Sequence, residues 1–173
     1  MRVIGGRFRS RKLKAVPGFL TRPTPDRLRE ALFNVLTPRI EDTIFLDAYA
    51  GTGAVAIEAL SRGARHAILI ERNVEALIVL RENLDSLGLK GEATVVRGAA
   101  IAKLDGLACD IAFLDPPYEK IDDYAACFSM LAPSDCQLAI AQHSSRMTLA
   151  EKYGRFTRKR MLTQGDNCLS FYE

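Results

Sequence analysis

The tetrapeptide Asp115-Pro116-Pro117-Tyr118 combines a carboxylate, a rigid backbone and an aromatic ring directly after the apolar segment 111–114. Two successive prolines restrict the backbone, so the Asp115 carboxylate and the Pro116 carbonyl are held in one layout. Two such acceptors can hold the hydrogens of an exocyclic base amine and aim its poorly nucleophilic lone pair, while Tyr118 stacks on the base. The motif indicates methylation of an amino group, although a strand that simply ends in a proline turn has the same pattern.

A second motif lies in residues 45–60, where an apolar strand pattern leads through a glycine-rich turn into a helical pattern. Gly51 and Gly53 let the backbone approach a ligand, and the helix after them presents unpaired N–H groups. Glu71 ends the next strand pattern about twenty residues on, where a carboxylate can accept from both hydroxyls of a ribose. These features also suit a nicotinamide dinucleotide. Asp47 favours S-adenosylmethionine, because a carboxylate there would repel a pyrophosphate and attract the cationic amino-acid end of the methyl donor.

Length and composition predict one domain comprising residues 1–173. A chain of 173 residues with 48% apolar content can bury a substantial core. No apolar run has membrane-spanning length, and the basic N-terminal segment lacks the apolar stretch of a signal peptide. The cysteines form no Cys-x-x-Cys pair, which indicates buried reduced thiols and no metal site. We therefore expect a cytoplasmic protein without a metal or a membrane anchor.

The net charge of +3 is unevenly distributed. Residues 1–40 contain ten Lys or Arg and two acidic residues, a balance of +8, which leaves −5 for the rest of the chain. Arg7, Arg9 and Arg11 alternate and would project from one face of a strand. We expect residues 1–22 to form a basic RNA-binding arm or hairpin, although a solvated, partly disordered tail has the same composition. The expected contacts to the nucleic-acid backbone are Arg2, Arg7, Arg9, Arg11, Lys12, Arg22 and Arg27.

The apolar periodicity predicts an α/β fold. Strand patterns occur near 43–47, 66–71, 93–97, 109–114 and 136–142, and helical patterns near 26–36, 53–62, 73–87 and 122–131. Two last strand-like segments, 155–162 and 167–172, are joined by a hairpin-like loop. We expect a mostly parallel seven-stranded sheet with an antiparallel C-terminal hairpin and helices on both faces. Ligands bind beyond the carboxyl ends of such strands, which is where Asp47, Glu71 and Asp115 fall.

Taken together, these residues resemble one family nearly end to end, the bacterial ribosomal RNA small subunit methyltransferase D family. The resemblance is carried by residues 1–6, 11–13, 22–24, 26–34 and 46–64 and by the tetrapeptide 115–118. It implies a class I methyltransferase with a Rossmann-like fold. It further implies transfer of a methyl group from S-adenosylmethionine to the 2-amino group of one guanine in 16S rRNA, within the small subunit or its precursor, with S-adenosylhomocysteine as the product. Separately from the resemblance, we expect a monomer.

The chain departs from the family pattern after the third strand. Relatives usually carry Asp or Asn there, whereas this chain has Ala99 and Ala100, whose backbone groups we expect to meet the adenine edge of the donor. Tyr49 either packs against the donor or faces the core. Gln142 stands where an acidic residue is common in relatives, and His143 is expected to be structural and not a base.

Two other functions share parts of these patterns. A DNA adenine or cytosine amino-methyltransferase would have the same donor site and the same Asp-Pro-Pro-Tyr motif, but such an enzyme typically needs extra sequence-reading elements. A non-catalytic RNA-binding module could have kept the fold and lost the donor, as Ala99 hints. Binding of the donor separates the second alternative from both enzymes, and methyl transfer to DNA or to ribosomal subunits separates the first.

Overall fold

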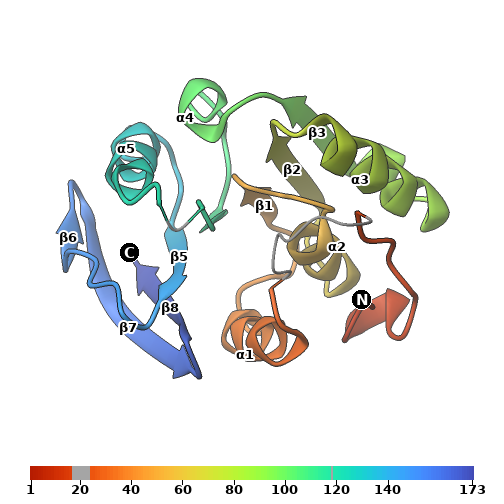
Figure 1. Ribbon diagram of the computed structural model, residues 1–173, viewed down its shortest axis with the longest axis horizontal. Coiled ribbons are helices and arrows are strands. Elements are labelled where there is room, and N and C mark those ends of the chain that lie inside the picture. Colours follow the sequence, from red (N-terminus) through yellow and green to blue (C-terminus); the bar gives the residue numbers. More distant parts are fainter. Residues whose placement is uncertain (17–23, 118) are drawn as a thin grey trace.

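The structure, a computed structural model, describes residues 1–16, 24–117 and 119–173 (Figure 1). Its strands are β1 (Ile44–Asp47), β2 (His66–Glu71), β3 (Ala93–Arg97), β4 (Ile111–Leu114), β5 (Leu138–Ser144), β6 (Lys152–Tyr153), β7 (Phe156–Gln164) and β8 (Asn167–Tyr172). Its helices are α1 (Asp26–Leu36), α2 (Ala54–Ser61), α3 (Val74–Ser86), α4 (Ala100–Lys103) and α5 (Asp122–Leu131), with 3-10 turns η1 (Gly6–Phe8) and η2 (Lys90–Glu92). Strands and helices alternate from β1 to β5, as the sequence pattern predicts.

All these strands belong to one sheet, in the order β3-β2-β1-β4-β5-β8-β7-β6. Strands β1 to β5 pair in parallel, β8 runs antiparallel to β5, and β7 runs antiparallel to β8. The prediction of a mostly parallel sheet with an antiparallel C-terminal hairpin is confirmed. The count of seven strands was one too low for the described chain, because β6 pairs with the start of β7 at the sheet edge. A strand of two residues is too short to show an alternating sequence pattern.

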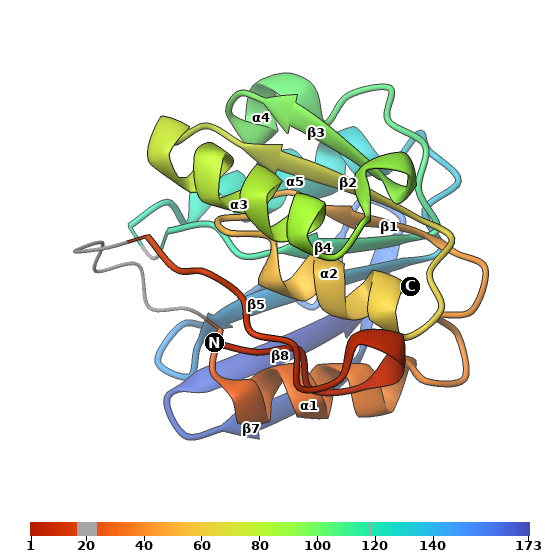
Figure 2. The same ribbon diagram turned by 90° about the vertical axis from the view of Figure 1, so that its right-hand side faces the viewer.

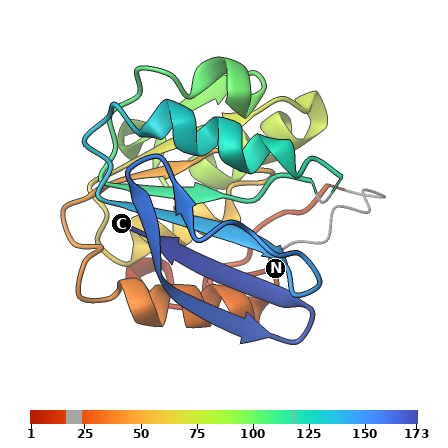
Figure 3. The same cartoon turned by 90° about the vertical axis from the view of Figure 1, so that its left-hand side faces the viewer.

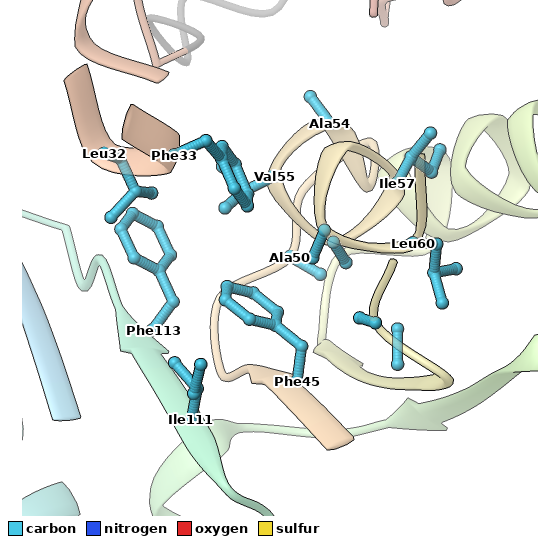
Figure 4. Close-up of a cluster of buried hydrophobic side chains, with 14 of the residues drawn as sticks. Leu32, Phe33, Phe45, Ala50, Ala54, Val55, Ile57, Leu60, Ile111 and Phe113 are labelled. Atoms are coloured by element: carbon cyan, nitrogen blue, oxygen red, sulfur yellow. The ribbon is translucent and has the colours of Figure 1, made fainter. Parts of the chain in front are cut away.

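Helices cover both faces of the sheet (Figures 2 and 3). The apolar sides of α1, α2 and α3 pack on one face, and those of α4 and α5 pack on the other. Figure 4 shows part of the first core, in which Phe33 of α1 and Val55 of α2 lie near Phe45 and Phe113 of the central strands. Because both faces of the central strands are covered and close-packed, their carboxyl ends are held in fixed relative positions.

Two short elements of the fold were not predicted from the sequence. Helix α4 and the turn η1 are each about one turn long, too short for an apolar period to be visible in the sequence. The four cysteines are free and buried. In the described ranges no helix has both the length and the apolar character needed to cross a bilayer.

Candidate active site

Three carboxylates meet at one edge of the sheet. Asp47 ends β1, Glu71 ends β2, and Asp115 directly follows β4. Strand β1 lies between β2 and β4 and pairs in parallel with both, so the three carboxyl ends are neighbours. All three side chains line a pocket of about 720 Å³. The sequence therefore placed these acids correctly at strand ends, and the sheet order brings them around one cavity.

The turn after β1 depends on its glycines. Gly51 and Gly53 both have positive φ, +53° and +85°, and Gly53 occupies the position that caps α2. A Cβ at Gly51 would meet nothing within 4 Å among the described atoms, so glycine is required there for its backbone conformation and not for space. The Gly51 N–H donates to Oε2 of Glu71 at 2.7 Å. The turn is thus fastened to the end of the neighbouring strand.

Glu71 holds this corner together. Besides Gly51, its Oε1 accepts from the backbone N–H groups of Arg72 at 2.8 Å and Asn73 at 2.7 Å. Asn73 in turn caps α3 through Oδ1, which accepts from the Ala76 N–H at 2.9 Å. A carboxylate offers about four acceptor sites, so these three bonds leave capacity for a further donor from the pocket.

Asp47 is buried, and its environment disfavours a negative charge. Its side chain is 1% exposed, and Oδ1 has no hydrogen-bond partner among the described residues. Burial, and after it the charge of Asp115, raises the pKa of Asp47 to about 8. Backbone hydrogen bonds from Tyr49 and Ala56 lower this pKa in part, and the charge of Glu71 raises it further. A buried acceptor without a partner costs about 1–3 kcal/mol. A cationic hydrogen-bond donor in the pocket would remove that cost and restore the carboxylate.

The Asp-Pro-Pro segment borders the same pocket. Asp115 is half-buried, and burial raises its pKa to about 7. Pro116 and Pro117 also line the cavity, and the Pro117 carbonyl accepts from the Lys120 N–H at 2.8 Å, which closes a turn. Tyr118, the fourth member of the motif, lies outside the described residues.

The Tyr49 hydroxyl is bonded to helix α5. Its hydroxyl donates to Oδ2 of Asp123 at 2.9 Å and lies 3.6 Å from Sγ of Cys127, both on α5. The ring is half-buried, lines the pocket and packs against the core under α5. The ring therefore faces both the pocket and the core, and its contact with the donor stays a prediction.

The end of β3 contributes backbone and not side-chain polarity. Gly98, Ala99 and Ala100 line the pocket, and Ala99 precedes the single turn of α4. The Gly98 N–H donates to the Glu71 carbonyl at 3.0 Å, which holds this segment against β2. No acidic side chain stands at these three positions, as the sequence shows.

Near its end, strand β5 carries two buried polar residues with different surroundings. Both ring nitrogens of His143 are engaged, Nδ1 with the Ser144 carbonyl at 3.0 Å and Nε2 with the Ser170 hydroxyl at 2.9 Å, and burial lowers its pKa. His143 does not line the pocket, which agrees with a structural role. Gln142 does line the pocket, and its Oε1 has no partner in the described part of the chain.

The N-terminal residues form a hairpin docked on the domain. Arg2 and Lys12 form an antiparallel bridge, and the Val3 N–H donates to the Arg11 carbonyl at 3.0 Å. The expectation of an arm or hairpin agrees with this geometry, but the expectation of a straight strand was wrong. Residues 6–8 form a 3-10 turn and Ser10 has a positive φ of 69°, so the alternating arginines do not share one strand face.

The basic side chains of the hairpin differ in their partners. Arg7 forms an ion pair with Glu92, and Arg11 donates to the Ser86 carbonyl at 3.2 Å. Three other predicted contacts are exposed and have no acidic partner within the described ranges, namely Arg2, Arg9 and Lys12. Arg27 is exposed on α1, and Arg22 lies outside the described residues.

Two buried polar side chains of α2 bond to the backbone of the hairpin, and the sequence pattern did not predict them. Glu58, 0% exposed on α2, accepts from the Ile4 and Gly5 N–H groups at 2.8 Å each. Ser61, one turn further along α2, accepts from the Phe8 N–H at 3.0 Å and donates to the Gly5 carbonyl at 2.6 Å. The only signal was a charged residue inside the otherwise apolar helix pattern 55–60.

Asn83 of α3 joins the hairpin to the glycine turn. Its Oδ1 accepts from the Lys14 N–H at 2.8 Å, and its Nδ2 donates to the Lys14 carbonyl at 3.1 Å and to the Thr52 carbonyl at 3.0 Å. The hairpin also reaches the pocket directly, because its lining includes Met1, Ala15, Val16 and, ahead of α1, Thr24. Hairpin and pocket are therefore one continuous surface.

Metal binding finds no support in the described residues, where no group of three His, Cys, Asp or Glu side chains is placed to hold an ion. The pocket's chemistry is instead that of buried carboxylates and backbone groups at the ends of parallel strands. Such an edge is where α/β sheets bind their ligands.

Comparison with known proteins places the chain in a family. The family model described as Conserved hypothetical protein 95 matches residues 1–173. A Bacillus subtilis protein named putative rRNA methyltransferase YlbH is 35% identical over 187 aligned residues, covering 100% of this chain and 98% of that protein. The ribosomal RNA small subunit methyltransferase D of Escherichia coli is 44% identical over 122 residues, which cover 69% of this chain and 61% of that protein.

The solved structures agree with the sequence relatives. The Escherichia coli structure titled putative methyltransferase yhhF has a TM-score of 0.84 and 35% sequence identity, with 99% of this chain and 96% of that chain covered. The Rossmann-like sheet described above is the class I methyltransferase fold. This chain therefore belongs to the Conserved hypothetical protein 95 family, and among class I methyltransferases it groups with the small subunit methyltransferase D proteins.

Proposed function

We propose that this protein transfers the methyl group of S-adenosylmethionine to the 2-amino group of a guanine in 16S rRNA, within the small ribosomal subunit or a precursor of it. The observation that carries the proposal is the cluster of Asp47, Glu71 and Asp115 around one pocket. The relatives named above support the substrate class, because both are named for methylation of ribosomal RNA.

The residues present fit the methyl donor. Asp47 has an unpaired buried acceptor and a raised pKa. A cationic amino group would donate a hydrogen bond to that acceptor, and its positive charge would lower the pKa. Glu71 would accept from the ribose hydroxyls, and the backbone of the Gly51 and Gly53 turn would lie close to the ligand. Tyr49 and the backbone of Ala99 and Ala100 would complete the adenosine side of the pocket. A dinucleotide fits less well, because its pyrophosphate would face the carboxylates.

The acceptor base would lie at the Asp-Pro-Pro segment. The bound donor supplies an electrophilic methyl group on a sulfonium. The Asp115 carboxylate and the Pro116 carbonyl accept the two hydrogens of the guanine amine and so aim its lone pair at that methyl group. Tyr118 would stack on the base. The methylated amine loses its proton readily, so positioning supplies most of the rate and no dedicated base is needed.

The hairpin is the proposed grip on rRNA. Arg2, Arg9 and Lys12 are exposed without acidic partners among the described residues, and the hairpin borders the pocket through Met1, Ala15 and Val16. Phosphate contacts of this kind supply affinity without reading sequence. We propose that residues 1–22 act as part of a single methyltransferase domain and that the protein works as a monomer in the cytoplasm, where small subunits are assembled.

Three substrates test the proposal, namely small subunits lacking the modification, naked 16S rRNA and duplex DNA, each incubated with isotopically labelled donor. Nucleoside mass spectrometry identifies the product. We expect N2-methylguanosine from rRNA in at least one of the first two samples and none from DNA. Light scattering during size-exclusion chromatography measures the oligomeric state.

Contrary outcomes select the alternatives. Methylation of adenine or cytosine in DNA would identify a DNA amino-methyltransferase. Absence of donor binding by calorimetry, with rRNA binding intact, would identify a non-catalytic RNA-binding module. In either case the assignment to guanine N2 would be abandoned.

A further inference from the structure

Gln142 and Asp115 lie at neighbouring strand ends. Strands β4 and β5 pair in parallel with Leu114 opposite Ala141, so Asp115 and Gln142 occupy the next rung of neighbouring strand ends. Both residues line the pocket. One residue earlier, Leu114 and Ala141 belong to the core under α4 and α5. Because side chains alternate along a strand, Asp115 and Gln142 both lie on the other face, the side of α1.

Gln142 carries an acceptor that the protein itself does not satisfy. The residue is 4% exposed, and Oε1 finds no hydrogen-bond partner in the described ranges. Its backbone is fixed, because the buried Tyr124 hydroxyl donates to the Gln142 carbonyl. Buried polar side-chain atoms are nearly always paired, so an unpaired acceptor at a pocket wall, on a backbone held in place, indicates that a ligand supplies the donor.

We propose that Gln142 determines the choice of base, with Oε1 accepting from N1–H of the target guanine while Asp115 accepts from its 2-amino group. This inference rests on the proposed function. Guanine presents two adjacent donor positions, N1–H and the 2-amino group, on its Watson–Crick edge. Adenine and cytosine each present an amino group beside an unprotonated ring nitrogen, which is an acceptor. A second acceptor beside Asp115 therefore matches guanine and opposes both other amino bases.

The unpaired state of Gln142 in the free protein follows from this role. A site built to accept a substrate N–H rejects an analogue that lacks it, because the buried acceptor then stays unsatisfied in the complex. In the free protein the acceptor is available for the base. Asp115 alone could hold any exocyclic amine, so the discrimination must come from a neighbouring group, and Gln142 lies on the adjacent strand end.

The test pairs two substrates with three variants. Small subunits are reconstituted with 16S rRNA that carries either guanine or 2-aminopurine at the modified position. 2-Aminopurine keeps the 2-amino group but has an unprotonated N1. We expect wild-type kcat/KM to favour guanine by about 10- to 100-fold. Gln142→Leu should lose most of this preference by losing activity on guanine, while its activity on 2-aminopurine is unchanged or higher.

Two further variants separate base recognition from general damage. Gln142→Glu keeps an acceptor and should keep the preference for guanine. Gln137→Leu changes an exposed glutamine that directly precedes the same strand and should behave as wild type. The melting temperature of Gln142→Leu should be unchanged or raised, since it removes an unpaired buried acceptor, whereas a structural role would lower it.

The outcomes distinguish this inference from the proposed function. If the wild-type protein methylates guanine and Gln142→Leu keeps the wild-type preference over 2-aminopurine, Gln142 does not read the base and the inference is wrong. A loss of preference in Gln142→Glu equal to that in Gln142→Leu would also overturn it, because an acceptor would then not be the relevant group. Absence of any guanine methylation by the wild type would overturn the proposed function, and the inference with it.

Discussion

The pocket at the strand ends and the N-terminal hairpin use polar groups in opposite ways. At the pocket, Asp47 and Gln142 are buried with acceptors that no described residue satisfies. At the hairpin, the buried acceptors of Glu58 and Asn83 are bonded to its backbone at short distances. The buried acceptors at the pocket thus await a donor, and those at the hairpin already have one.

This difference separates binding chemistry from structural chemistry within one surface. Unpaired buried acceptors cost free energy in the free protein and are retained where a ligand compensates for them. The hairpin instead gains stability from its bonds to α2 and α3, so it is part of the folded domain and only its outward cations are available to RNA. Asn83, bonded to both Lys14 and Thr52, lies where the two regions meet.

The largest effect should come from removing the carboxylate under the hairpin. Glu58→Ala leaves the Ile4 and Gly5 N–H groups and the Arg62 Nε without their acceptor. Removing one member of a buried ion pair typically costs about 3–5 kcal/mol. We expect a loss of that size in urea unfolding and faster amide exchange in residues 1–14. The exposed Glu75→Ala is the matched control, and equal stability of the two variants would show that the hairpin is not docked in solution.

The next effect tests the pocket as a site of chemistry. Asp115→Ala should lower kcat on small subunits by about 10²- to 10³-fold, the usual consequence of removing a group that acts in the transition state. Donor affinity should be retained or slightly increased, because the charge of Asp115 contributes to the raised pKa of Asp47.

Calorimetry and single-turnover kinetics measure these two quantities separately. The exposed Asp105→Ala serves as the control for removal of a carboxylate. Normal turnover by Asp115→Ala would exclude the proposed mechanism, and an equal loss of donor affinity would assign Asp115 to the donor and not to the base.

Sequence reasoning succeeded where the determinants are local. Each of Asp47, Glu71 and Asp115 follows an apolar run that ends in a turn signal, and parallel pairing then brings strand ends together. It failed where contacts are distant or conformation is special, since Glu58 meets Ile4 across 54 positions. The arginine alternation misled because η1 and the positive φ of Ser10 turn the chain between residues that a strand would have aligned.

The third prediction uses the raised pKa of Asp47, which is about 8 in the folded protein against an ordinary value of 3.8. The folded state holds the proton more tightly than the unfolded chain, so this group destabilises the fold as pH rises from about 4 to about 8. Asp47→Asn should remove that penalty and raise the melting temperature at pH 8.5, by roughly 2–4 °C per kcal/mol for a domain of this size.

The same variant should lose donor binding. Wild-type affinity should increase from pH 6 towards pH 8 as Asp47 ionises, until the donor's α-amino group loses its own proton near pH 8. Asp47→Asn should bind weakly at every pH and lack this dependence. Calorimetry at pH 5, 7 and 8.5 measures donor affinity, and thermal melts at the same pH values measure stability. A variant that is less stable at pH 8.5, or that keeps the pH dependence of binding, would remove Asp47 from the assigned role.

The smallest effect concerns the outward face of the hairpin. Arg9 and Lys12 are exposed and have no acidic partner in the described chain, whereas Arg7 is already paired with Glu92. If the first two contact phosphates, Arg9→Ala/Lys12→Ala should leave donor binding and folding intact. It should flatten the salt dependence of subunit binding by roughly 0.7–0.9 in log–log slope per lost contact.

Arg7→Ala should change the slope less, because Glu92 competes with RNA for its charge. The comparison variant is Lys159→Ala/Arg160→Ala, which removes two exposed cations from β7. A wild-type slope for the hairpin variant and a flattened slope for the β7 variant would move the RNA surface to the C-terminal hairpin and leave the N-terminal one with a structural role alone.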